Sequence, residues 1–145
     1  MLWGFHTALA YAPAETSGRP KPPTVLVVED EVLIRMAISD YLRDCGYRVV
    51  EAGNGDEAIT VLKADPHIDV VFSDVSMPGE TDGFVLAQWV RRERPGLRVI
   101  LTSGIGKTAR EATELCGEGP LLDKPYDHGD VERRIRELLA NLAKS

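Results

Sequence analysis

Hydrophobic residues after position 23 fall into short runs that alternate with longer segments of helical periodicity. The runs occupy residues 25–28, 49–50, 70–72, 99–101 and 121–122. Three of them are β-branched and nearly continuous, which is typical of strands that helices cover on both faces. The segments at about 31–45, 55–64, 82–93, 107–115 and 128–142 have the spacing of amphipathic helices. This alternation predicts an α/β domain with an open parallel sheet.

The beginning of the chain has a different composition. Residues 13–23 (PAETSGRPKPP) include four prolines among small and charged residues, and such a segment buries too little apolar surface to order itself. We therefore expect a flexible N-terminal tail over residues 1–23 and one folded domain over residues 24–145. The length of 145 residues and the 43% content of hydrophobic residues suit a single domain with a core.

Charge and cysteine content restrict the partners and the compartment. A formal net charge of -6 disfavours a nucleic-acid or anionic-membrane surface, because both require a basic patch. Cys45 and Cys116 lack the spacing of a disulfide framework or a zinc site. The apolar residues 1–11 are too few to cross a bilayer, which takes about 20. We expect a cytoplasmic protein, although an Ala-x-Ala pattern within residues 9–12 leaves a signal peptide open.

Residues that can carry chemistry follow four of the five predicted strands. They are Glu29-Asp30-Glu31, Ser73-Asp74, Thr102-Ser103-Gly104 and Asp123-Lys124-Pro125. Ligands of parallel α/β sheets bind beyond the carboxyl ends of the strands, and clustered carboxylates with oxygen-only ligands suit magnesium. The pattern predicts Asp74 as a nucleophile for phosphoryl transfer, with Lys124 and Ser103 contacting the phosphoryl oxygens. Taken alone, each residue could instead be a helix cap, a turn or a solvated loop residue.

The fragments VLVVEDE, FSDVSMPG, DGF, ILTSG and LLDKP occur in this order. They resemble the receiver domain of two-component response regulators, over about residues 24–142. The resemblance implies a flavodoxin-like, doubly wound sheet of five parallel strands in the order 2-1-3-4-5, with helices on both faces. It also implies that Asp74 becomes an aspartyl phosphate in a phosphorelay, with a histidine kinase or a histidine phosphotransfer protein as the donor.

The same resemblance gives roles to single residues. It implies Mg²⁺ bound by Glu29, Asp30, Asp74 and the backbone carbonyl of Ser76. Lys124 would contact the phosphoryl group and precede a cis proline. Ser103 matches the switch hydroxyl of the family, and Thr102 is the alternative in a shifted register.

Two positions depart from the family pattern. Leu121 stands where many members have a Tyr or Phe that turns inward on phosphorylation, so the usual readout is expected to be altered. The loop over the site has one residue more between Pro78 and Gly83 than the commonest form, which predicts a reshaped loop. Because only three residues follow the last predicted helix, we expect a stand-alone receiver that signals through contacts with an unidentified protein.

The leading hypothesis is therefore a single-domain response regulator whose only chemistry is its own phosphorylation and dephosphorylation, not an enzyme with a diffusible substrate. A phosphorylation-independent interaction scaffold with the same fold stays open because of Leu121, and so does homodimer formation. An aspartate-based phosphohydrolase usually has a second acid where this chain has Ser76. A flavin-binding protein of this fold would need a hydroxyl-rich phosphate loop after the first strand.

Overall fold

The computed structural model describes residues 21–103 and 121–144. The strands are β1 (Thr24–Val28), β2 (Arg48–Ala52), β3 (Val70–Asp74), β4 (Arg98–Ser103) and β5 (Leu121–Asp123). The helices are α2 (Val32–Asp44), α3 (Gly55–Ala64), α4 (Gly83–Glu93) and α6 (His128–Lys144). The predicted helix at 107–115 and residues 1–20 of the predicted tail lie outside the described residues. No helix in the described ranges combines the length and apolar character of a membrane span.

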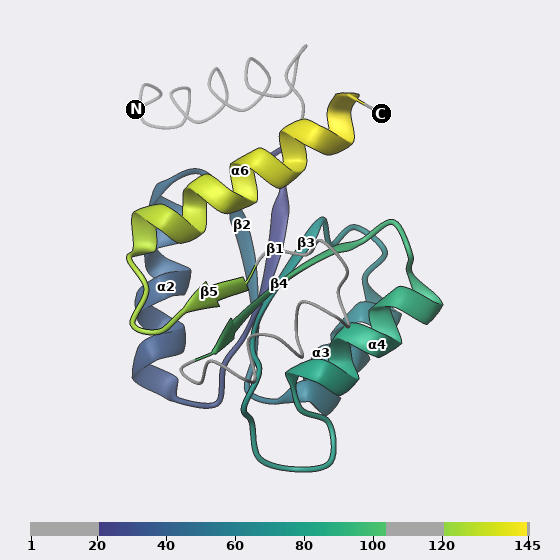
Figure 1. The fold of residues 1–145 in the computed structure, drawn as a ribbon. Helices are drawn as coiled ribbons and strands as arrows, with labels where there is room; N and C mark the ends of the chain where they lie inside the picture. Colours follow the sequence, from purple (N-terminus) through teal and green to yellow (C-terminus); the bar gives the residue numbers. More distant parts are fainter. Residues whose placement is uncertain (1–20, 104–120, 145) are drawn as a thin grey trace, which may run out of the picture.

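The five strands form one parallel sheet in the order β2-β1-β3-β4-β5. Helices α2 and α6 cover one face of the sheet, and α3 and α4 cover the other (Figure 1). This arrangement confirms the predicted fold class and the strand order that the family resemblance implied.

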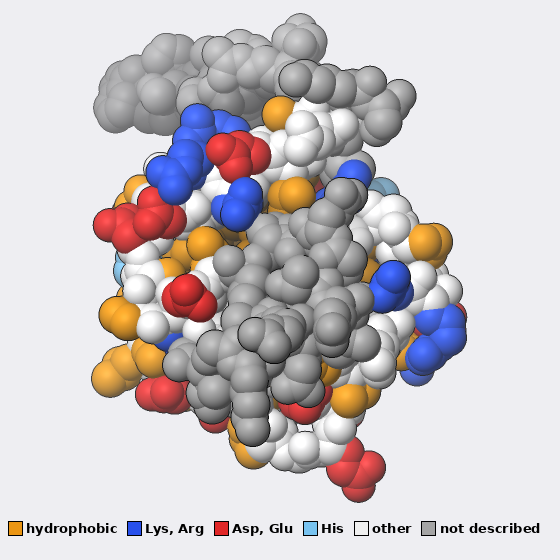
Figure 2. Space-filling model, in the orientation of Figure 1, with side chains coloured by type: hydrophobic (Ala, Val, Ile, Leu, Met, Phe, Trp, Pro, Cys, Tyr) orange, Lys and Arg blue, Asp and Glu red, His pale blue; other side chains and the backbone are white. Residues whose placement is uncertain are grey.

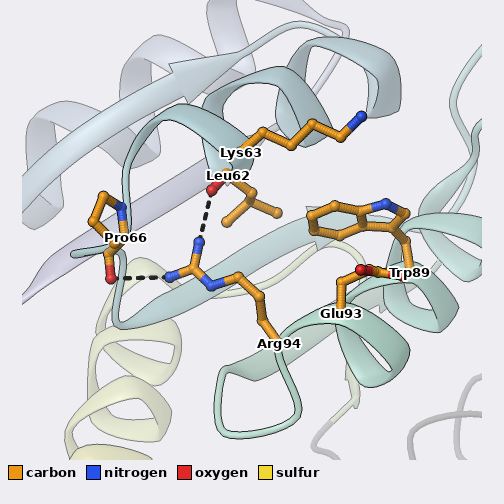
Figure 3. A pocket seen from close by; sticks show the side chains of 6 residues that line it. All are labelled: Leu62, Lys63, Pro66, Trp89, Glu93 and Arg94. Carbon is orange, nitrogen blue, oxygen red and sulfur yellow. Dashed lines mark hydrogen bonds between the residues drawn. The ribbon is translucent and has the colours of Figure 1, made fainter.

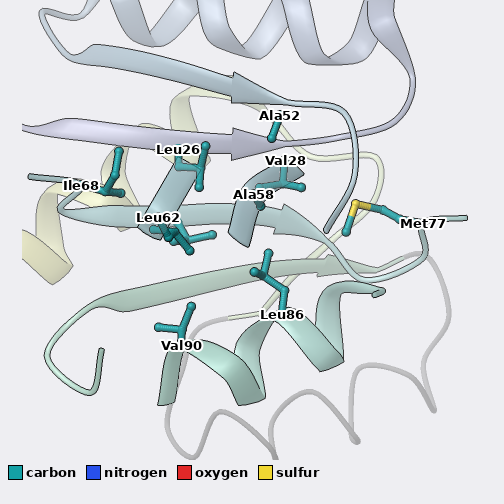
Figure 4. Close-up of a cluster of buried hydrophobic side chains, with 10 residues drawn as sticks. Leu26, Val28, Ala52, Ala58, Leu62, Ile68, Met77, Leu86 and Val90 are labelled. Carbon is teal, nitrogen blue, oxygen red and sulfur yellow. The ribbon is translucent and has the colours of Figure 1, made fainter. Parts of the chain in front are cut away.

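Two large clusters and one small cluster of buried hydrophobic residues hold the described helices against the sheet. The core under α3 and α4 includes Leu26 of β1, with Leu62, Leu86 and Val90 from the helices (Figure 4). The core under α2 and α6 includes the next residue of β1, Val27, with Ile38, Leu42, Val131 and Ile135 from the helices. Neighbouring residues of β1 thus enter different cores because side chains alternate across a strand. A slip of one residue would exchange the two sets, so burial fixes the register of the central strands.

The register brings the carboxyl ends of the strands to one edge of the sheet, which we call the rim. Val28 of β1 is paired with Ser73 of β3, and Asp74 is paired with Thr102 of β4. Ser103 is paired with Asp123 of β5. The residues that end or follow β1, β3, β4 and β5 therefore meet at the rim.

The helix ends explain some of the polar residues that follow the strands. Asn54 caps α3 by accepting a hydrogen bond from the Glu57 amide, and Asp82 caps α4 by accepting one from the Val85 amide. Glu31 occupies the same position at α2, but its side chain makes no capping hydrogen bond. Helix capping therefore does not account for the acidic residues after β1.

Candidate functional site

Three acidic residues converge at the rim. Glu29 and Asp30 follow β1, and Asp74 ends the neighbouring strand β3. One carboxylate oxygen of each residue lies within 4.8 Å of those of the other two. Glu29 and Asp74 are buried, with 4% and 7% of their surface exposed, whereas Asp30 is exposed. Because two of these charges are removed from water, the group requires a compensating cation.

Lys124, which follows β5, supplies part of that compensation. Its Nζ lies 2.8 Å from Asp74 Oδ2 and 3.3 Å from Glu29 Oε1. Burial alone would lower the pKa of Lys124, but the hydrogen bonds and charges of Asp74 and Glu29 outweigh burial and raise it. Lys124 is therefore a fixed ammonium group at neutral pH. The peptide bond from Lys124 to Pro125 is cis, as the resemblance implied.

Glu29 is fixed through its side chain and its backbone. Its Oε2 accepts a hydrogen bond from the Glu31 amide (3.2 Å), and its carbonyl accepts one from Arg35 Nη1 (2.8 Å). Burial, and then the charge of Asp74, raise the pKa of Glu29 despite the opposing effects of the Glu31 amide and of Lys124. The ionised form of Glu29 is thus incompletely stabilised by the protein, and a bound cation would stabilise it further.

The backbone around Asp74 is held on both sides. The Ser76 amide donates to Asp74 Oδ1 (3.1 Å), and the Val75 amide donates to the Thr102 carbonyl (2.9 Å). Gly83 begins α4 so close to the Asp74 carbonyl that a Cβ at Gly83 would overlap it. The Gly83 amide also donates to the Val75 carbonyl (2.8 Å). Both ends of the loop of residues 76–82 therefore lie beside Asp74.

Two hydroxyl residues end β4. Thr102 lies opposite Asp74 in the register, Ser103 follows it toward the rim, and both residues are buried. The Ser103 carbonyl accepts a hydrogen bond from the Lys124 amide (3.0 Å), which ties Ser103 to the residue that binds Asp74. The choice between Ser103 and Thr102 as the switch hydroxyl stays a prediction.

The acidic group fits a magnesium ion by its chemistry. Mg²⁺ prefers six oxygen ligands at about 2.0–2.1 Å, so its ligand atoms lie at most about 4.2 Å apart. Carboxylate oxygens of Glu29, Asp30 and Asp74 already lie within 4.8 Å of one another, so the three residues lie close enough together to share one ion. The exposure of Asp30 leaves a side of the group open to the waters that Mg²⁺ usually keeps.

A hollow of about 480 Å³ lies at the opposite end of the sheet, where α3 and α4 end (Figure 3). Trp89, Leu62 and Pro66 line it together with the Arg94 guanidinium. The Arg94 guanidinium donates to the carbonyls of Leu62 (2.8 Å) and Pro66 (3.1 Å), so it closes the end of α3. Its hydrogen bonds give Arg94 a structural role, and the hollow has no part in the chemistry at the rim.

The structure brings together most of the predicted site residues. Glu29, Asp30, Asp74 and Lys124 converge, and the Ser76 backbone contacts Asp74. The side chain of Leu121 lies outside the described set, so its expected effect is untested. Sequence reasoning missed the bond from Arg35 to the Glu29 carbonyl. The sequence signal that could have indicated this bond was the basic residue Arg35, which lies one turn into the predicted helix after Glu29 and Asp30.

Comparison with known proteins agrees with this geometry. Residues 25–136 match the family described as the response regulator receiver domain. The chain therefore belongs to the response regulator receiver domain family.

The chain also resembles curated proteins and a solved receiver domain. The chain is 36% identical over 116 residues to a probable transcriptional regulator ycf27 of Cyanophora paradoxa, covering 79% of this chain and 47% of that protein. It is also 36% identical over 111 residues to the transcriptional regulatory protein PdtaR of Mycobacterium tuberculosis, covering 76% and 53%. The chain thus spans about half the length of these curated relatives. The receiver domain of NtrX from Brucella abortus superimposes with a TM-score of 0.70 at 30% identity, covering 83% and 99%.

Proposed function

We propose that this chain is a phosphorylation-controlled receiver in a two-component phosphorelay, with Asp74 as the phosphoacceptor. The observation that carries the proposal is the setting of the Asp74 carboxylate. It is buried, its Oδ2 lies 2.8 Å from Lys124 Nζ, and the carboxylates of Glu29 and Asp30 lie within 4.8 Å. Such a carboxylate is a nucleophile whose phosphorylated product would lie beside a fixed ammonium group.

In the proposed reaction, a carboxylate oxygen of Asp74 attacks the phosphorus of a phosphohistidine on the donor. The O–P bond forms as the P–N bond breaks, and the imidazole nitrogen leaves with the electron pair and takes up a proton from water. Lys124 contacts the phosphoryl oxygens, and the Ser103 hydroxyl, with Thr102 as the alternative, donates to them. Hydrolysis later returns Asp74 and inorganic phosphate. We propose a phosphoacceptor whose only chemistry is its own phosphorylation and dephosphorylation, and not an enzyme.

Mg²⁺ is the proposed cofactor of this reaction. The carboxylates of Glu29, Asp30 and Asp74 would hold it, together with the backbone carbonyl of Ser76. When bound, the ion supplies positive charge that neutralises the transferring phosphoryl oxygens. The resident residues keep the acceptor oriented, because Ser76 and Lys124 bind the two oxygens of Asp74 from different sides.

The proposed donor is a histidine kinase or a histidine phosphotransfer protein that docks beside the rim. Three large apolar residues of α2 are exposed there: Val32 (53%), Leu33 (81%) and Met36 (48%). Val32 begins the helix two residues after Asp30. A donor that brings a phosphohistidine to Asp74 would cover this patch, and contiguous exposed apolar surface is typical of protein contacts.

The proposed output is a contact with another protein. On α6, Arg133, Arg134 and Arg136 form ion pairs with Asp130, Glu137 and Glu132. Basic and acidic side chains accordingly lie next to one another over α6 in Figure 2. This balanced surface, together with the net charge of -6, favours a protein partner over a nucleic acid.

Phosphorylation tests the proposed function directly. The full chain is incubated with Mg²⁺ and acetyl phosphate, and intact mass is measured alongside Asp74→Asn. We expect the wild type to gain one phosphoryl group that is stable in acid and labile in base, and the variant to gain none. A wild type that stays unmodified with acetyl phosphate and with phosphohistidine donors would favour the interaction scaffold instead. Steady turnover of a phosphomonoester would favour a phosphohydrolase.

Donor docking is tested by charge insertion into the exposed patch. Leu33→Glu should slow phosphorylation by a phosphohistidine protein about tenfold or more, because a buried unpaired charge opposes association. It should leave phosphorylation by acetyl phosphate unchanged, since that donor needs no docking surface. Val85→Glu, at a residue 39% exposed on α4, is the matched control. Equal slowing by both variants would contradict docking at α2.

A further inference from the structure

Arg35 of α2 joins the acidic group to the edge of the sheet. Its Nη1 donates to the Glu29 carbonyl (2.8 Å), and its Nε donates to Glu51 Oε1 on β2 (3.2 Å). The side chains of Arg35 and Glu51 are only 20% and 27% exposed, so water competes weakly for these bonds. Because the guanidinium is planar and rigid, the two contacts together set its orientation.

The bond from Arg35 orients one particular peptide group. The Glu29 carbonyl belongs to the peptide unit that joins Glu29 to Asp30, the two acidic residues after β1. On the other side of Glu29, its amide donates to the Ala52 carbonyl of β2 (3.1 Å). Both peptide groups around Glu29 are thus tied to neighbouring elements, and the Arg35 bond is the one adjacent to Asp30. Asp30 is exposed, so its carboxylate depends on this backbone for its position.

A second arginine of α2 holds the partner of the first. Arg43 Nη2 donates to Glu51 Oε2 (3.0 Å), while its other hydrogen bonds go to the Val49 carbonyl and to Asp40. Glu51 therefore binds one arginine with each carboxylate oxygen. Arg35 contacts the backbone of the acidic group, whereas Arg43 binds only the other carboxylate oxygen of Glu51, together with Val49 and Asp40.

We propose that Arg35 is a positioning residue that sets the Mg²⁺ affinity of the rim by orienting the Glu29–Asp30 peptide, with Glu51 holding its guanidinium. This inference rests on the proposed function, because it assumes that Glu29 and Asp30 hold the ion. Groups that orient metal ligands commonly change metal affinity about 10- to 100-fold when they are removed. Arg35 binds a backbone carbonyl, so we expect the lower end of that range.

Isothermal titration calorimetry of the full chain with Mg²⁺ tests the proposal. Arg35→Gln should raise the Kd for Mg²⁺ about tenfold. Arg43→Gln removes the same charge from the same helix and the bond to the other carboxylate oxygen of Glu51, and should change the Kd less than about threefold. Without metal, the amide resonance of Asp30 should shift in Arg35→Gln and stay in place in Arg43→Gln.

Arg35→Lys distinguishes the effect of the guanidinium hydrogen bonds from the effect of the positive charge. It also replaces Arg35→Gln as the test if that variant does not fold. Lysine keeps the positive charge but cannot bond Glu29 and Glu51 with one rigid plane, so its Kd should also rise. The positioning role would be overturned if Arg35→Lys bound Mg²⁺ with the Kd of the wild type. It would also be overturned if Arg35→Gln and Arg43→Gln lost the same amount of Mg²⁺ affinity. If the wild type itself binds no Mg²⁺, the proposed function fails as well, whereas unchanged binding in the Arg35 variants overturns this inference alone.

Discussion

Without bound metal, the Glu29→Gln variant should gain stability relative to the wild type as the pH rises. Burial and the charge of Asp74 raise the pKa of Glu29 in the folded protein above its ordinary value of 4.5. A carboxyl group with a raised folded-state pKa contributes stability below about pH 4.5, and this contribution is lost as the pH rises through the raised pKa. Glutamine at position 29 cannot ionise, so the variant avoids that loss.

The size of the effect follows from opposing contributions. At an effective dielectric constant of about 20, repulsion between Glu29 and Asp74, whose carboxylate oxygens lie within 4.8 Å, is worth at least about 3.5 kcal/mol, and attraction to Lys124 at 3.3 Å about 5 kcal/mol. The balance, at most about 1.5 kcal/mol, favours ionisation, but removing a carboxylate from water costs several kcal/mol. The net penalty for ionised Glu29 is therefore of the order of 1 kcal/mol, or about 4 °C in Tm for a domain of this size.

Urea denaturation of both proteins in chelator-containing buffer, from about pH 3.5 to about pH 8, measures this penalty. The free energy of unfolding of Glu29→Gln minus that of the wild type should increase by about 1 kcal/mol over the range. A hydrogen bond that glutamine fails to reproduce costs the same at every pH, so the trend isolates the charge. Saturating Mg²⁺ should abolish or reverse the trend. A difference that is constant or falls with pH without metal would refute the reasoning.

Three further changes test the surroundings of the site. Asn54→Ala removes the cap of α3 and should lower the free energy of unfolding by about 1 kcal/mol in urea denaturation. Gly55→Ala places a Cβ against the Thr81 backbone and should cost about 2 kcal/mol; Gly96→Ala, with open space around it, should cost much less. Lys124→Met should lower the free energy of unfolding by about 2 kcal/mol at neutral pH, because it leaves two buried carboxylates uncompensated. That advantage of the wild type persists below about pH 10.5 and disappears as the pH rises through the raised pKa of Lys124.

The sequence was sufficient for the fold because the strands carry a strong local signal. Runs of valine mark β1 and β3, which are buried along their whole length. The prediction for β2 was short at both ends, since Arg48 and Glu51 are polar and belong to an edge strand whose pairing with β1 sets its length. Tertiary pairing, and not composition, determines such boundaries.

The site was predictable as a set of residues but not as a set of contacts. Alternation of strands and helices was enough to place Glu29, Asp74 and Lys124 at one rim. The contact of Lys124 with two carboxylates depends on the register of four strands. The pattern of hydrophobic residues does not predict the resulting distances between side-chain atoms. The bond from Arg35 to the Glu29 carbonyl depends on the path of the backbone between β1 and α2.

The closed geometry of the loop over residues 76–82 has a consequence for sequence variation. Its two ends are joined by the bond between the Gly83 amide and the Val75 carbonyl, and Gly83 rests on the Asp74 peptide. Added residues lengthen a loop whose anchor points are already in contact, and the entropy cost of such growth rises only slowly with length. We expect the extra residue that the sequence predicts between Pro78 and Gly83 to be accommodated in this way. Insertions and deletions within this loop can therefore diversify the surface above the site while Asp74 stays in place.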